Sequence, residues 1–288
     1  MRHDRSHKWL LLPSLLLIIV FLAAPAIYVG WLSVHESTFG KQPVYVGLQN
    51  YARLVEDPVF WRAFWNTFFV VNGIAYGELI LGLLVAVLIR DQRYGRPLLI
   101  AVILAPYAIT ESSGIVMWRY MLEPDVGILS TLISKIGFGT VAWSSDATAT
   151  LALASLIAIW HHLPFTFLIL FAALLIIPKE ILEAAEVDGA SRWQRFMRIE
   201  LRIIIPAILI ALMFRYIFAI RLFSEIWLLT QGGPARLSEV LSIYLYKETF
   251  QYREFGIASA VGWVMVLMSL AIALPYIVRM YREIARHG

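Results

Sequence analysis

The sequence contains no cysteine. Disulfide bonds, thiolate metal sites and cysteine nucleophiles are therefore excluded for this chain. A phosphate-binding loop of the form G-x-x-x-x-G-K-[ST] is also missing, because Gly40-Lys41 lacks both the upstream glycine and the following hydroxyl. We expect that the chain binds no cofactor and cannot hydrolyse ATP alone.

Charged residues are scarce as well. They make up 15 % of the 288 residues, whereas 60 % of the residues are hydrophobic. An apolar run of about 20 residues is long enough to cross a bilayer, where a helix satisfies its own backbone hydrogen bonds. The sequence therefore predicts an all-α polytopic membrane protein with six transmembrane helices in one transmembrane domain over 1–288. The predicted spans are 9–31, 65–90, 97–118, 148–177, 203–229 and 255–278.

The first apolar run has two interpretations. Ala23-Ala24-Pro25-Ala26 is compatible with the end of a cleaved signal peptide. The apolar residues continue to Trp31, which gives the length of a full span and favours a retained first helix.

Positive charges are distributed unevenly between the predicted loops. The side that carries both termini and the loop 178–202 has 14 Lys and Arg residues, the opposite side has 8, and Arg215 and Arg221 lie within the fifth predicted span. The positive-inside rule places the termini and this loop in the cytoplasm. The net charge of +4 is too small to favour nucleic-acid binding.

The loop 178–202 has a pattern typical of a helix, a turn and a second helix. Pro178 suits the first turn of a helix, and Asp188-Gly189 is a turn signal in which glycine can adopt a positive φ. Ser191 and Gln194 have the spacing of a capping box at the start of the second helix.

The same loop resembles the EAA loop of permease subunits in binding-protein-dependent ABC importers. The matching residues are Glu183-Ala184-Ala185, Gly189 and Ile199-x-Leu201, while Arg202 stands where that family usually has proline. In such permeases this segment docks on the cytoplasmic ATPase. The resemblance implies that the coupling residues of this chain are Glu183, Ala184, Ala185, Asp188 and Gly189.

The resemblance extends over residues 10–280. Further matches include Gly47-Leu48-x-Asn50-Tyr51, Leu163-Pro164-Phe165 and Thr230-x-Gly232-Gly233-Pro234. They are similar to the first permease subunit of maltose-type carbohydrate and glycerol-phosphate importers. This implies a bacterial or archaeal cytoplasmic membrane, a second homologous permease subunit and an external solute-binding protein, periplasmic or lipid-anchored. It also implies two ATPase subunits, which hold the ATP and Mg.

Charges at membrane depth are candidate substrate ligands because they are costly unless paired or hydrated. Arg215 lies about 18 Å into the fifth predicted span at 1.5 Å per residue. It either binds an anionic or hydroxyl-rich solute with its planar guanidinium or forms a structural pair with Glu78 or Glu111. Arg221 and Glu225 have i, i+4 spacing and are predicted to pair with each other.

Aromatic and imidazole side chains on the fourth predicted span are further candidates. Trp160 and Phe165 could stack on sugar C–H surfaces, and His161 and His162 could hydrogen-bond hydroxyl groups, although packing is the alternative for this cluster. Adjacent histidines point about 100° apart on a helix, so we expect no metal site from them. Glu111 follows the Pro106 break and either contributes to an outer gate or packs against a partner.

These observations predict the permease subunit of an ABC importer for a sugar or sugar-like solute. An anionic solute, such as a phosphorylated, sulfonated or acidic sugar, is favoured if Arg215 contacts it. The alternative is an ion-coupled carrier that uses Glu78, Glu111 and Arg215. An integral-membrane enzyme is disfavoured, because no loop carries a paired catalytic set.

Overall fold

The computed structural model describes residues 12–92, 94–124, 126–138 and 142–287. It contains helices and one antiparallel pair of short strands, in which His35 pairs with Tyr45. The chain forms two compact units, one of residues 1–61 with 244–267 and one of residues 62–243 with 268–288, and each is described by itself.

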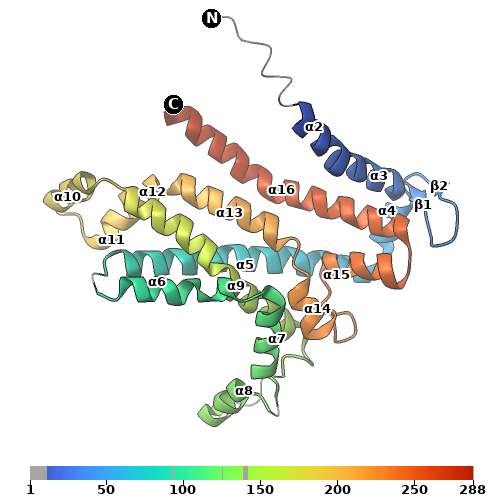
Figure 1. Cartoon of the computed structure of the whole chain (residues 1–288), viewed down its shortest axis with the longest axis horizontal. Helices are drawn as coiled ribbons and strands as arrows, with labels where there is room; N and C mark the ends of the chain where they lie inside the picture. The colour runs from blue at the N-terminus through green and yellow to red at the C-terminus, as the bar shows by residue number, and fades with distance from the viewer. Residues whose placement is uncertain (1–11, 93, 125, 139–141, 288) are drawn as a thin grey trace, which may run out of the picture. The chain divides into compact units, whose positions relative to one another are not determined.

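The elements up to the middle of the chain are drawn in Figure 1. They are α2 (Leu12–Ile18), η1 (Ile19–Ala23), α3 (Ala24–Ser33), β1 (His35–Glu36), β2 (Val44–Tyr45), α4 (Gln49–Glu56), α5 (Pro58–Arg90), α6 (Arg96–Leu104), η2 (Ala105–Ala108), α7 (Glu111–Met121), α8 (Ile128–Ile133) and η3 (Ser134–Phe138).

The second half begins with the longest helix after α5 and ends with an equally long one. Its elements are α9 (Ala147–Ile176), α10 (Lys179–Val187), α11 (Arg192–Arg195), η4 (Phe196–Glu200), α12 (Leu201–Ile203), α13 (Ile205–Ala219), α14 (Ser224–Thr230), α15 (Leu241–Tyr246), η5 (Lys247–Gln251) and α16 (Phe255–His287).

Four helical stretches among the described residues are long and apolar enough to cross a membrane: Pro13–Ser33, Pro58–Arg90, Ala147–Ile176 and Phe255–Met280. Two further candidates are bent pairs, Arg96–Ala108 with Glu111–Met121 at 98° and Arg192–Ile203 with Ile205–Ala219 at 66°. The total is therefore four to six candidate spans.

Two of the predicted spans are not single helices. The third is interrupted after Pro106, which has no N–H to continue an α-helical ladder and lies in the turn η2. The fifth, predicted over 203–229, ends as a helix at Ala219, and the chain starts again at Ser224. The carbonyl of Leu222 in this break accepts a hydrogen bond from the Ser242 hydroxyl, so a tertiary contact replaces the lost helical bond. The continuous fifth helix is therefore wrong.

Asn50 holds the smaller unit together near its first residues. Its Nδ2 donates to the carbonyls of Ser33 and His35, each at 2.9 Å, and the Tyr51 hydroxyl donates to Ser33 Oγ at 2.9 Å. The backbone of Gly256 lies so close to the His35 carbonyl that a side chain would not fit. The Asn-Tyr and Phe-Gly motifs of the sequence thus meet at one point of this unit.

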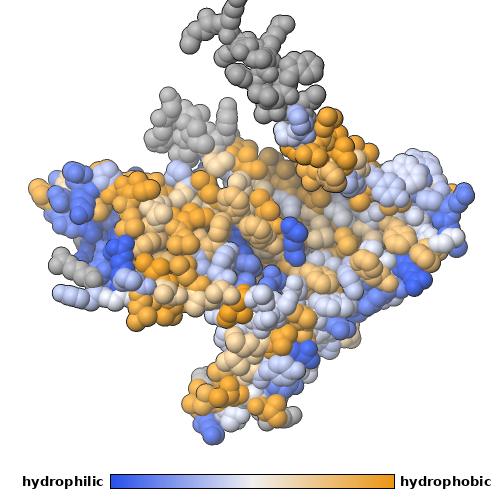
Figure 2. Space-filling view, viewed as in Figure 1, coloured by the Kyte–Doolittle hydropathy of each residue, from blue (hydrophilic) through white to orange (hydrophobic). Residues whose placement is uncertain are grey.

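In the larger unit, α5 and α9 approach each other through glycine. A Cβ on Gly82 would lie 3.1 Å from Thr166 Cγ2 and 3.4 Å from the backbone nitrogen of Phe167. Next to this contact lies a buried apolar cluster formed by Ala86, Ile89, Phe167, Leu170, Phe171, Leu174, Ile177 and Ile204. Figure 2 shows hydrophobic side chains over the surface of the long helices and hydrophilic ones gathered where α10 and α11 lie.

This packing generates a prediction for Gly82→Leu. The larger side chain has no space against the backbone of α9, and overpacking of this kind costs roughly 1–3 kcal/mol. We expect a lower thermal unfolding midpoint for the variant purified in detergent. Gly73→Leu on the same helix is the control, since nothing lies within 4 Å of a Cβ there. Equal midpoints for the two variants would contradict the close approach of α5 and α9.

Candidate functional site

The segment from α10 to α11 forms the helix, turn and helix that the sequence predicts. Gly189 has φ 78° and follows the end of α10, where its N–H donates to the Glu186 carbonyl at 3.0 Å. Ser191 and Gln194 form a complete capping box at the start of α11. The local geometry is confirmed; the docking role remains a prediction.

The coupling residues predicted from the resemblance lie together on α10 and at its end. Ala185 is buried, whereas Glu183, Ala184, Asp188 and Gly189 are exposed. A buried alanine lets α10 lie close to the rest of the unit, and the acidic and glycine positions stay available to another protein. The described geometry is therefore suited to docking.

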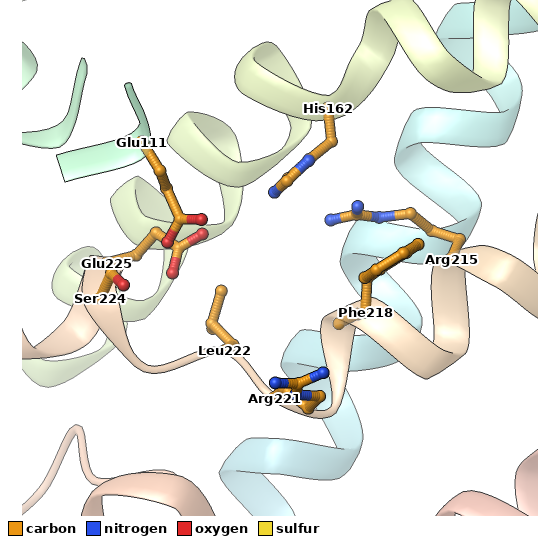
Figure 3. Close-up of a pocket in the computed structure, with 9 residues that line it drawn as sticks. Glu111, His162, Arg215, Phe218, Arg221, Leu222, Ser224 and Glu225 are labelled. Atoms are coloured by element: carbon orange, nitrogen blue, oxygen red, sulfur yellow. The ribbon is translucent and has the colours of Figure 1, made fainter. Parts of the chain in front are cut away.

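A second site is a cavity of about 370 Å³ in the larger unit. It lies where α7, α9 and α13 meet the broken segment before α14 (Figure 3). The lining residues are Glu111, His162, Arg215, Phe218, Ala219, Arg221, Leu222, Ser224 and Glu225. Three of the six predicted substrate residues, Glu111, His162 and Arg215, are thus brought to one cavity.

Arg215 is paired behind this cavity with Glu78 of α5. Its Nε lies 2.6 Å from Glu78 Oε2, and the Thr166 hydroxyl donates to Glu78 Oε1 at 2.5 Å. Arg215 is 4 % exposed and Glu78 is fully buried. The Arg215 N–H is not aligned for a hydrogen bond, so the contact is an ion pair that joins α5, α9 and α13. The structure thus supports the structural pair with Glu78.

The charges around the cavity are separated by sign. Figure 3 shows the carboxylates of Glu111 and Glu225 close together, and the side chains of Arg215 and Arg221 on other sides of the space. The predicted pair between Arg221 and Glu225 is wrong. The helix ends between these two residues, so the i, i+4 geometry on which that prediction rested does not exist. Arg221 is exposed and, among the described residues, makes no ion pair.

Three predicted substrate residues do not line the cavity. Trp160 packs edge-on against Trp118, with ring centroids 5.5 Å apart. His161 stacks on Tyr107 at 6.0 Å, and Phe165 packs edge-on against Phe214 at 5.8 Å. These contacts match the packing alternative for the aromatic cluster.

Sequence reasoning did not place Phe218, Ala219, Leu222 and Ser224 in the site. They face the cavity because the helix stops at Ala219, and the segment that follows contains neither proline nor glycine to signal the break. Within the described residues, no group of three His, Cys, Asp or Glu side chains could hold a metal ion.

Known proteins similar to this chain were found at the level of family, sequence and structure. Residues 58–282 match the binding-protein-dependent transport system inner membrane component family. The trehalose/maltose transport system permease protein MalF of Thermococcus litoralis is 30 % identical over 273 residues, covering 93 % of this chain and 91 % of the relative.

A second relative is the sulfoquinovosyl glycerol transport system permease protein SmoG of Agrobacterium fabrum. It is 30 % identical over 261 residues, covering 91 % of this chain and 84 % of the relative. The structure is similar to that of a bacterial alginate ABC transporter in complex with an alginate pentasaccharide-bound periplasmic protein. The TM-score is 0.82 at 25 % identity, over 96 % of this chain and 93 % of that one.

The buried ion pair generates a prediction for Glu78→Ala. Removing the carboxylate leaves the Arg215 guanidinium buried without its counterion, which costs about 3–5 kcal/mol. The unfolding midpoint of the purified protein should fall. In the double variant Glu78→Ala, Arg215→Ala it should fall by less than the sum of the two single effects. Additive losses would mean that the two charges do not interact.

Proposed function

The chain belongs to the binding-protein-dependent transport system inner membrane component family, and from this premise we propose that its cavity conducts a sugar-like, negatively charged solute. The family match covers residues 58–282, and the resemblance inferred from the sequence is confirmed. The chain is a permease subunit of an ABC transporter and not an enzyme. Family membership also favours ATP-driven import over the ion-coupled carrier.

One observation carries the proposed charge of the solute: Arg221 lines the cavity without an ion pair among the described residues. The charge of Arg215 is already balanced by Glu78, so Arg221 is the cation left for a phosphate, sulfonate or carboxylate group. Two relatives support an anionic cargo by their names, the sulfoquinovosyl glycerol permease and the importer of the acidic polysaccharide alginate. The trehalose/maltose relative carries neutral sugars and marks the alternative outcome.

The other side of the cavity supports recognition of hydroxyl groups. Carboxylates accept hydrogen bonds from hydroxyls, and Glu111 and Glu225 supply two of them. Ser224 and His162 add groups that both donate and accept. The proposed solute therefore has its anionic group toward Arg221 and its hydroxyls toward the two glutamates.

The proposed mechanism is alternating access. ATP binding closes the partner ATPase subunits, which carry α10 and α11 with them, and the spans then open the cavity toward an external solute-binding protein. Hydrolysis returns the inward-facing state. In this scheme the described chain holds the solute and converts the motion of the ATPase into gating, together with a second permease subunit. Both termini and α10 lie in the cytoplasm.

Substituting Arg221 tests the charge of the solute. Arg221→Gln should reduce ATP-dependent uptake of anionic sugars into proteoliposomes by at least about tenfold, the loss expected for one charge-assisted hydrogen bond. Neutral disaccharide uptake is measured in parallel. Arg53→Gln, an exposed cation of α4 outside the cavity, is the control. Undiminished uptake of the anionic sugar by Arg221→Gln would overturn the proposal.

Glu183→Lys tests the docking role of α10. The exposed carboxylate becomes a cation on the same face, so we expect the ATPase subunits to be lost when the chain is purified by an affinity tag. Co-purification of the second permease subunit should persist, because it reports insertion and folding. If the ATPase subunits remain bound to Glu183→Lys, α10 is not the docking helix.

A further inference from the structure

Four side chains of alternating charge connect the α10–α11 segment to the end of α5. Glu186 of α10 contacts Nη1 of Arg195, and Arg195 Nε lies 3.1 Å from Oε1 of Glu200. The other oxygen of Glu200 accepts a hydrogen bond from Nη1 of Arg90, the last residue of α5. Glu200 thus uses each carboxylate oxygen for an arginine from a different helix.

Burial distinguishes the middle of this chain of charges from its ends. The Glu200 side chain is 1 % exposed, and those of Arg90 and Arg195 are 11 % and 13 % exposed. Glu186 is 62 % exposed, so its pair with Arg195 is screened by water and contributes little. A buried carboxylate held by two planar guanidinium groups has a fixed geometry instead. The rigid part of the connection is therefore Arg90–Glu200–Arg195.

The surroundings of Glu200 make this connection the firm one. Ile89, beside Arg90, and Ile204, whose N–H donates to the Glu200 carbonyl at 3.1 Å, belong to the same buried apolar cluster. The backbone route from α11 to α13 passes through a bend of 66° between Ile203 and Ile205. A bend in the backbone absorbs motion, whereas a buried ion pair across two elements transmits it.

We infer that Glu200 is the positioning residue that makes the α10–α11 segment and the end of α5 move as one body when the ATPase subunits close. The inference rests on the proposed docking of α10 and adds the route by which its motion reaches the spans. Glu200 touches no solute and no nucleotide. Its role is to hold Arg90 and Arg195 at a fixed separation.

The test measures this separation in the assembled transporter with its ATPase subunits. Because the native chain has no cysteine, spin labels at Tyr94→Cys and Val187→Cys, both exposed, report the distance between the end of α5 and α10. Distances are recorded without nucleotide and with Mg-ATP under vanadate trapping. We expect one narrow distribution in both states for the native joint, and a shifted or broadened distribution with Mg-ATP for Glu200→Gln.

Two further variants separate the joint from general folding. Arg90→Gln leaves Glu200 neutralised by Arg195, so the fold is retained while the connection to α5 is lost, and the distribution should broaden as for Glu200→Gln. Arg90→Lys keeps the charge and should restore part of the narrow distribution. Asp91→Asn removes the exposed carboxylate that also contacts Arg90 and should behave like the native protein.

The outcomes decide between this inference and the proposed function. Native distributions in both Glu200→Gln and Arg90→Gln would overturn the inference while leaving the docking role intact. If Glu200→Gln does not assemble, the distribution of Arg90→Gln decides in the same way. A native chain that retains no ATPase subunits would instead refute the proposed function. ATP hydrolysis near the native rate, together with loss of the fixed distance in Arg90→Gln, supports transmission by Glu200.

Discussion

A charge placed in the hydrocarbon of a membrane costs at least about 2.5 kcal/mol unless it is paired or reaches water. The arrangement of the central helices depends on how this chain meets that constraint. Glu78 of α5 and Arg215 of α13 form an ion pair, and Thr166 of α9 donates to the same carboxylate. Three helices are thereby fixed in register, and the close approach of α5 and α9 at Gly82 becomes possible next to it.

The cavity exists because helices stop where a span would continue. α7 begins at Glu111 after a bend of 98°, and α13 ends at Ala219 before the chain restarts at Ser224. Backbone groups freed in this way are tolerated at membrane depth only where they meet protein partners or line a polar space. Broken helices thus bring carboxylates and Arg221 to a space that continuous helices would fill with apolar side chains.

The two polar regions of the larger unit use charge differently. Around the cavity, Arg221 is left without an ion pair among the described residues, which suits a site that must bind and release a solute. At the α10–α11 segment, Glu200 is held by Arg90 and Arg195, which suits a connection that must not slip. In both regions one buried carboxylate fixes an arginine that a neighbouring helix carries.

The sequence by itself determined the features that depend on neighbouring residues. Apolar runs predicted the long helices, Ser191 and Gln194 predicted the capping box, and Gly189 predicted the left-handed turn, because each signal lies within a few residues of its effect. The family resemblance was likewise readable from motifs of fixed spacing.

Only the tertiary structure decided which charges meet. Thr166 lies 88 residues from Glu78, and Arg90 lies 110 residues from Glu200, so no local pattern relates them. The break after Ala219 was equally invisible, since its carbonyl partner is a serine 20 residues further along the chain. Such pairs form because helices distant in sequence must satisfy one another where water is absent.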